Sequence, residues 1–187
     1  MSRTPSNMLP LGTRAPQFRL FDTVSQQHVS LDELKSDKAT VIAFICNHCP
    51  FVLHLRDKLI EVAHHYTALG VQFIAISANN AVAYPADSPE NMAIEARKHH
   101  FSFPYLYDET QAIAKAYNAA CTPDFYLFDN DLKCVYRGQF DDSRPGNNIP
   151  ITGRDLTAAL DNLLAGKAIN PEQKPSLGCN IKWKDLS

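Results

Sequence analysis

The stretch Cys46-Asn47-His48-Cys49-Pro50 decides the fold of this chain. It follows the apolar run 39–45, which is typical of a buried strand, and precedes an amphipathic stretch typical of a helix. Both thiols therefore lie at a strand-to-helix junction, where unsatisfied N–H groups and partial positive charge lower a cysteine pKa. Because the spacing lets the second thiol close on the first, the pair predicts exchange with other disulfides.

The residues after this motif extend the pattern into a βαβ unit. Apolar side chains recur at steps of three and four from 50 to 69, which predicts a helix that ends at Gly70. Val71–Ala78 then reads as a second buried strand, and two strands joined by a helix run parallel with a right-handed crossover. Reactive sites of such sheets lie outside the carboxyl ends of the parallel strands, and Cys46 falls there.

The rest of the chain predicts an α/β fold, in which helices flank a mixed central sheet. Ser88-Pro89-Glu90 is typical of a helix start, within a central helical insertion at 80–118. The other predicted elements are an N-terminal β-hairpin (18–22 and 28–31), a helical turn (31–34), a short strand (103–107), a short helix (109–118), an antiparallel hairpin (125–128 and 133–140), a solvated loop (141–150), and a helix capped by Thr152 and Asp155 that reaches about Ala165.

Length and composition favour one globular domain. The chain has 187 residues, and we expect a single domain over 1–166 that begins with an irregular lead-in at 1–16. Residues 167–187 are expected to form a tail that carries Cys179. The chain contains 45% hydrophobic and 20% charged residues, which is ordinary globular composition. We expect a monomer or a homodimer.

Charge and hydropathy exclude several classes of partner. The net charge of −2 without a basic stripe argues against nucleic acid, and no apolar run approaches the ~20 residues that span a bilayer. The N-terminus lacks the apolar core of a signal peptide, so we expect a cytoplasmic protein. In that compartment paired cysteines are more often catalytic or metal-binding than structural.

The order of elements resembles the thioredoxin superfamily, with CxxC at the first strand-to-helix junction and a proline opening the late hairpin. The early hairpin and the insertion are similar to its peroxiredoxin-like branch, the alkyl hydroperoxide reductase and thiol-specific antioxidant group. The resemblance spans about 10–184 and implies a thioredoxin-like fold. Four stretches of the chain resemble an uncharacterised bacterial CxxC subfamily: 46–50, Ala120-Cys121-Thr122-Pro123-Asp124-Phe125, 136–145 and 175–183.

The resemblance implies a division of labour between the two motif cysteines. Cys46 matches the exposed, attacking thiol, which would form a mixed disulfide with the substrate, and Cys49 matches the thiol that resolves it. This chemistry needs no cofactor. CxxC is also half of a zinc site, but no second CxxC or HxxxH follows, so we expect no metal.

Two further positions bear on the acidity of the pair. A cationic His48 beside the thiolate would lower its pKa further and make the pair more oxidising, whereas an exposed histidine would have little effect. Thioredoxins carry a buried Asp six residues before the first cysteine. Here that position is Thr40, so deprotonation must be assisted by another group.

Pro123 matches the cis-proline that faces the CxxC pair in the superfamily. The resemblance implies an exposed backbone edge at Thr122, to which a substrate strand would bond. An ordinary trans-proline at a strand start is the alternative.

Three more cysteines complete the set. Cys121 is close enough to Pro123 to form an alternative disulfide, shield Cys46 or ligate a metal, and it is as readily a small buried residue. Cys179 lies where we expect a mobile tail, which would let it fold back and resolve a mixed disulfide or a sulfenic acid. Cys134 reads as core.

Three functions follow. The first is a thiol–disulfide oxidoreductase that acts on protein or low-molecular-weight disulfides and is recycled by a thiol reductant. The second is a thiol peroxidase built on Cys49-Pro50. Because Cys46 and Pro123 replace the hydroxyl and the arginine that activate peroxide in that family, we expect slow peroxide chemistry at most. The third is a Cu(I) carrier that uses both motif cysteines, although such carriers have longer cysteine spacing.

Overall fold

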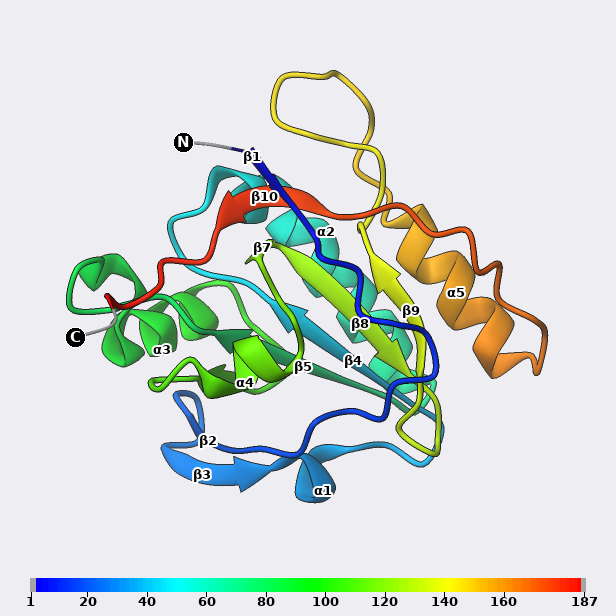
Figure 1. The fold of residues 1–187 in the computed structure, drawn as a ribbon, viewed down its shortest axis with the longest axis horizontal. Coiled ribbons are helices and arrows are strands. Elements are labelled where there is room, and N and C mark those ends of the chain that lie inside the picture. Colours follow the sequence, from blue (N-terminus) through cyan, green and yellow to red (C-terminus); the bar gives the residue numbers. More distant parts are fainter. Residues whose placement is uncertain (1–2, 186–187) are drawn as a thin grey trace.

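Residues 3–185 are described by a computed structural model, shown in Figure 1. No helix among them combines the length and the apolar character needed to cross a lipid bilayer. The strands are β1 (Arg3–Pro5), β2 (Arg19–Asp22), β3 (Gln27–Ser30), β4 (Ala39–Phe44), β5 (Val71–Ser77), β6 (Tyr105–Tyr107), β7 (Cys121–Thr122), β8 (Asp124–Phe128), β9 (Cys134–Gly138) and β10 (Leu177–Asn180). The helices are α1 (Leu31–Leu34), α2 (Pro50–Ala68), the 3-10 turn η1 (Pro85–Asp87), α3 (Pro89–Lys98), α4 (Ala112–Ala116) and α5 (Arg154–Leu164).

A mixed seven-stranded sheet forms the centre, in the order β3-β2-β6-β5-β4-β8-β9. Strands β4, β5 and β6 are parallel neighbours, and the remaining pairs are antiparallel. The predicted βαβ unit is confirmed as β4–α2–β5, with Ala39 opposite Val71 and Phe44 opposite Ile76. The predicted N-terminal hairpin and the late hairpin are confirmed as β2–β3 and β8–β9.

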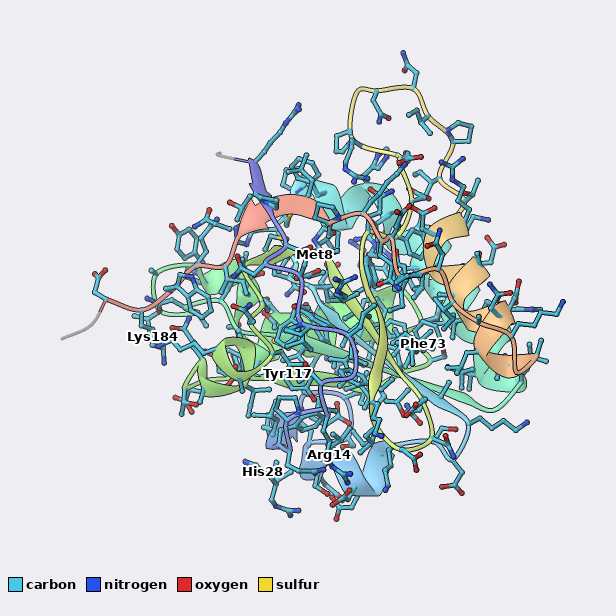
Figure 2. All side chains as sticks on the ribbon, turned by 45° about the vertical axis from the view of Figure 1, so that its right-hand side comes forward. Met8, Arg14, His28, Phe73, Tyr117 and Lys184 are labelled. Atoms are coloured by element: carbon cyan, nitrogen blue, oxygen red, sulfur yellow. The ribbon has the colours of Figure 1, made fainter. Side chains whose placement is uncertain are left out.

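Each face of the sheet buries a separate core. Along β4, Val41 points to one face and Ile42 to the other, as the period of two requires. Helices α2, α3 and α5 cover the face that contains Phe73, whereas the segment before β2 and helix α4 cover the face that contains Tyr117. Figure 2 shows both aromatic side chains inside the body of the molecule, while His28 lies at its periphery.

The two ends of the chain differ from the prediction. A short strand, β1, forms within the expected irregular lead-in, and the expected tail contributes β10. These strands and β7 make a second sheet in the order β1-β10-β7, with Arg3 opposite Cys179 and Cys179 opposite Thr122. Figure 1 shows β10 running beside β1 and across the end of β7. Strands this short carry no alternation from which they could be recognised.

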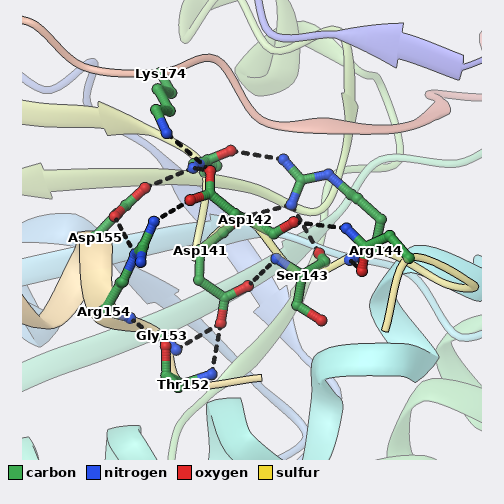
Figure 3. A network of polar contacts seen from close by, with 11 residues as sticks. Asp141, Asp142, Ser143, Arg144, Thr152, Gly153, Arg154, Asp155 and Lys174 are labelled. Carbon is green, nitrogen blue, oxygen red and sulfur yellow. Dashed lines mark hydrogen bonds and ion pairs between the residues drawn. The ribbon is translucent and has the colours of Figure 1, made fainter. Parts of the chain in front are cut away.

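The cap predicted for the last helix is wrong. Helix α5 has Gly153 rather than Thr152 as its N-cap, with φ of 68°, and the Thr152 hydroxyl accepts the N–H of Arg154 at 3.3 Å without forming the predicted capping pair with Asp155. The carboxylate of Asp141 instead accepts the N–H groups of Thr152 at 2.7 Å and Gly153 at 2.6 Å, as well as that of Ser143 at 2.9 Å (Figure 3). Asp141 is 2% exposed, so the first part of the loop at 141–150 is folded against the domain rather than solvated.

We predict that Gly178→Ala destabilises the protein by about 2 kcal/mol, because it overpacks the β10–β7 contact. A Cβ atom at Gly178 would lie 1.9 Å from the Thr122 carbonyl oxygen, so the two strands must separate. Urea unfolding measures the loss.

Gly146→Ala is the control, because no heavy atom lies within 4 Å of its added Cβ atom. We expect Gly146→Ala to lower the free energy of unfolding by only about 1 kcal/mol, because an alanine must adopt the left-handed backbone conformation at φ of 84°. Equal losses in the two variants would contradict the packing argument.

Candidate functional site

The CxxC pair occupies the predicted junction between β4 and α2. Cys49 is the N-cap of α2, Pro50 takes the first helical position, and the carbonyl oxygen of Cys49 accepts the N–H of Leu53 at 2.9 Å. The expectation that Cys46 is exposed is wrong. Its side chain is 3% exposed and that of Cys49 is 0% exposed. Strand β10 lies against Cys49 through Cys179.

The Thr122–Pro123 peptide is cis, as expected, and faces both motif sulfurs. The sulfur of Cys49 lies 3.2 Å from the Thr122 carbonyl oxygen, and that of Cys46 lies 3.5 Å from the Thr122 hydroxyl oxygen. The expected exposed edge at Thr122 is not exposed. Thr122 is 3% exposed because β10 pairs with it, where the sequence predicts an open position for a substrate strand.

A third sulfur belongs to this centre. Cys179, in β10, places its sulfur 2.8 Å from that of Cys49. The expectation of a mobile tail cysteine is wrong, because Cys179 lies in a paired strand and is 2% exposed. The sulfur of Cys121, also fully buried, faces the Pro123 carbonyl oxygen at 3.8 Å. Cys134 lies in the opposite core, as predicted.

The hydrogen bonds within the pair favour negative charge on Cys49 over Cys46. A hydrogen bond from the Cys46 thiol is the main reason that the pKa of Cys49 is lowered to about 5. Burial opposes this shift, and hydrogen bonds from Cys179, Thr122 and the Val52 N–H assist it. The pKa of Cys46 is raised well above its usual range by that same hydrogen bond, by burial and by a nearby carboxylate. The sequence predicts a lowered cysteine pKa at this junction, and the structure assigns it to Cys49, because Cys49 is the helix N-cap and receives these donors.

The nearby carboxylate is Asp87, which the sequence analysis missed. Its Oδ2 atom lies 2.6 Å from Nδ1 of His48 and accepts a hydrogen bond from Asn79 at 2.8 Å, while its Oδ1 atom accepts the Asn47 N–H at 2.7 Å. Asp87 is fully buried, and the ring of His48 stacks on that of Tyr84. The predicted benefit of a cationic His48 to the thiolate is therefore opposed by a carboxylate that raises the pKa of Cys46.

The sequence gives only a weak indication that Asp87 belongs to the site. It stands directly before Ser88-Pro89, which reads as a helix start, so an acid there is explained locally. Its contact with the CxxC loop joins positions 40 apart and follows from tertiary folding alone.

At the position of the missing acid, Thr40 is fully buried and its hydroxyl accepts the Ser36 N–H at 3.1 Å. A different acid, Asp124, directly follows Pro123 and is buried. Burial raises the pKa of Asp124 to about 7, although hydrogen bonds from Ser6, Tyr126 and its own strand lower it in part. Asp124 is therefore a buried carboxyl that titrates near neutral pH, on the strand that follows the cis-proline.

One group of possible metal ligands is found among residues 3–185. Ligand atoms of Cys46, His48 and Asp87 lie within 4.8 Å of one another. A thiolate, an imidazole and a carboxylate suit Zn²⁺ rather than Cu(I), which prefers soft sulfur ligands. The set also leaves out Cys49, which the alternative of a Cu(I) carrier requires.

Comparison with known proteins gives a consistent family. Residues 10–156 match the Redoxin family. The crystal structure of an uncharacterised conserved protein from Geobacillus kaustophilus is 58% identical, with 100% of this chain and 99% of that chain covered and a TM-score of 0.98. No curated protein gives a significant match.

Two more distant solved structures share the fold. A peroxidoxin from Mycobacterium tuberculosis is 17% identical over 86% of this chain and 100% of its own, with a TM-score of 0.65. The thioredoxin domain of a thiol-disulfide oxidoreductase from Bacteroides vulgatus is 17% identical over 72% of this chain and 92% of its own, with a TM-score of 0.61. With its CxxC junction, its cis-proline and the match over most of its length, this chain belongs to the Redoxin family of the thioredoxin superfamily.

Proposed function

We propose that this protein is a thiol–disulfide oxidoreductase that uses Cys46 and Cys49 to reduce or exchange disulfides of proteins or small thiols, with a thiol reductant to recycle it. The observation that carries the proposal is the placement of both sulfurs against the cis Thr122–Pro123 peptide at the N-terminus of α2. Membership of the Redoxin family supports redox chemistry of this kind. We expect the protein to act in the cytoplasm.

The proposed reaction begins with a proton shift inside the pair. The Cys46 thiol donates to the Cys49 thiolate, so transfer of that proton gives a Cys46 thiolate without any external base. Cys46 then attacks one sulfur of the substrate disulfide, which breaks the substrate bond and releases the other sulfur as a thiolate. Cys49 gives up its proton to that leaving thiolate and attacks Cys46, which forms the Cys46–Cys49 disulfide and releases the reduced substrate.

The role of Thr122 and His48 is part of the same proposal. The Thr122 hydroxyl is within 3.5 Å of the Cys46 sulfur, where it lowers the pKa of that thiol and so favours the attacking thiolate. The ring of His48 is held beside the pair by Asp87, whose Oδ2 atom lies 2.6 Å from its Nδ1 atom. A substrate strand would pair with the Thr122 edge only after β10 has separated from it.

We predict that Cys46→Ser abolishes turnover of a model protein disulfide and of glutathione disulfide, because the attacking sulfur is lost. Cys49→Ser should instead accumulate mixed disulfides, which mass spectrometry detects as added substrate mass. Cys134→Ser, which removes a buried thiol from the opposite core, is the matched control. Unchanged turnover in Cys46→Ser would contradict the proposal.

We predict that the reduced protein contains a thiolate at neutral pH that is lost as the pH falls through about 5. The hydrogen-bond donors to Cys49 favour its charged form, so its pKa is lowered and the thiolate persists down to this pH. The difference in thiolate ultraviolet absorbance between the wild type and Cys49→Ser, recorded against pH, measures the titration of Cys49. A midpoint near the ~8.5 of an ordinary cysteine would contradict the charge assignment.

A thiol peroxidase is the second candidate, because Cys49 has the lowered pKa and stands directly before Pro50. We predict slow consumption of hydrogen peroxide, because Pro123 lies where such peroxidases carry an activating arginine. A coupled peroxide assay on wild type and both serine variants checks this. Fast turnover that is lost in Cys49→Ser and retained in Cys46→Ser would replace the oxidoreductase proposal by the peroxidase.

A further inference from the structure

The strand β10 occupies the backbone edge beside the cis-proline. Cys179 stands opposite Thr122, and Asn180 stands opposite Cys121. Gly178 makes this approach possible, because any Cβ atom there would collide with the Thr122 carbonyl oxygen. The chain thus supplies, from its own end, an antiparallel strand with a cysteine at the position next to the CxxC pair.

This strand is fixed at both ends by contacts to the elements around the site. The hydroxyl of Ser176 donates to the Pro123 carbonyl oxygen at 2.5 Å, and the N–H of Ile181 donates to the Ala120 carbonyl oxygen at 3.0 Å. Beyond it, the N–H of Lys182 donates to Asn79 at 2.8 Å. Together these contacts hold the sulfur of Cys179 at a defined place rather than on a mobile tail.

We propose that Cys179 is a third redox-active thiol, which takes over the bond to Cys49 after the CxxC pair has been oxidised. The two sulfurs lie 2.8 Å apart, whereas a disulfide bond is ~2.05 Å long, so a small side-chain movement joins them. Cys49 is thereby shared between two partners, Cys46 from its own loop and Cys179 from β10. The inference rests on the proposed function for the supply of the Cys46–Cys49 disulfide.

The step is an internal thiol–disulfide exchange. The Cys179 thiolate attacks the sulfur of Cys49, the Cys46–Cys49 bond breaks, and the Cys49–Cys179 bond forms. Cys46 leaves as a thiolate and takes up the proton that Cys179 released. Electrons balance without an added oxidant or reductant, since one disulfide is exchanged for another.

The exchange has two consequences for the site. Cys46 becomes a thiol again beside His48 while the protein remains oxidised. At the same time β10 becomes covalently tied to the N-cap residue of α2, so the Thr122 edge stays closed to a substrate strand until a reductant opens the new bond.

Peptide mapping tests the proposal directly. Trypsin releases Cys46 and Cys49 together in peptide 39–56, Cys179 in peptide 168–182 and Cys121 in peptide 116–133. The full chain is oxidised in glutathione buffers of graded potential, quenched in acid, alkylated with N-ethylmaleimide and digested. We expect peptide 39–56 joined to 168–182, with the alkyl group on Cys46, alongside peptide 39–56 that has lost two hydrogens through its internal disulfide.

Variants identify the bond. Cys179→Ser should lose the joined peptide while it keeps the internal disulfide. Cys121→Ser is the matched control, because it removes another buried thiol of the same strand pair and should leave the joined peptide unchanged. Circular dichroism checks that each variant is folded.

The outcomes separate the two proposals. If wild type forms only the internal disulfide at every potential, the role of Cys179 is overturned and the proposed function stands. If Cys46 and Cys49 never pair and turnover is absent, the proposed function falls and this inference falls with it. A joined peptide in wild type that carries the alkyl group on Cys49 instead of Cys46 also overturns the exchange.

Discussion

The close approach of β10 to β7 is the contact on which the rest of the site depends. The Gly178 backbone packs against the Thr122 carbonyl, and this brings Cys179 to 2.8 Å from Cys49 and closes the edge beside Pro123. Both motif cysteines beside this contact are buried. A side chain at position 178 would keep the strands apart, so one glycine permits both the pairing of β10 with β7 and the approach of the third sulfur.

Charge inside this covered site is set by which sulfur receives hydrogen bonds. Cys49 lies at the N-terminus of α2 and accepts from neighbouring thiols and a backbone N–H, which lowers its pKa. Cys46 donates, is buried, and faces the field of Asp87, all of which raise its pKa. The two cysteines therefore behave as one unit with a single shared charge, and the proton between them links the low-pKa thiol to the attacking one.

Most of the central sheet could be predicted because its signals are local. The apolar run before Cys46, the three-and-four spacing after Pro50 and the second buried strand fix β4, α2 and β5 within a residue or two. The cis-proline was anticipated from resemblance to a superfamily. The start of α5 could not be anticipated, because Asp141 binds the N–H groups of Thr152 and Gly153, directly before the helix, from a loop that reads as solvated.

The sequence by itself determined that a CxxC pair stands between a buried strand and a helix, since periodicity, helix caps and the cysteine spacing are properties of neighbouring residues. Only the tertiary structure decided that Asp87 faces His48, that Cys49 holds the charge and that Cys179 joins the centre. The sulfurs of Cys49 and Cys179 meet across 130 positions of chain. Such a contact is fixed by the pairing of β10 with a strand distant in sequence, and no local pattern of residues encodes that pairing.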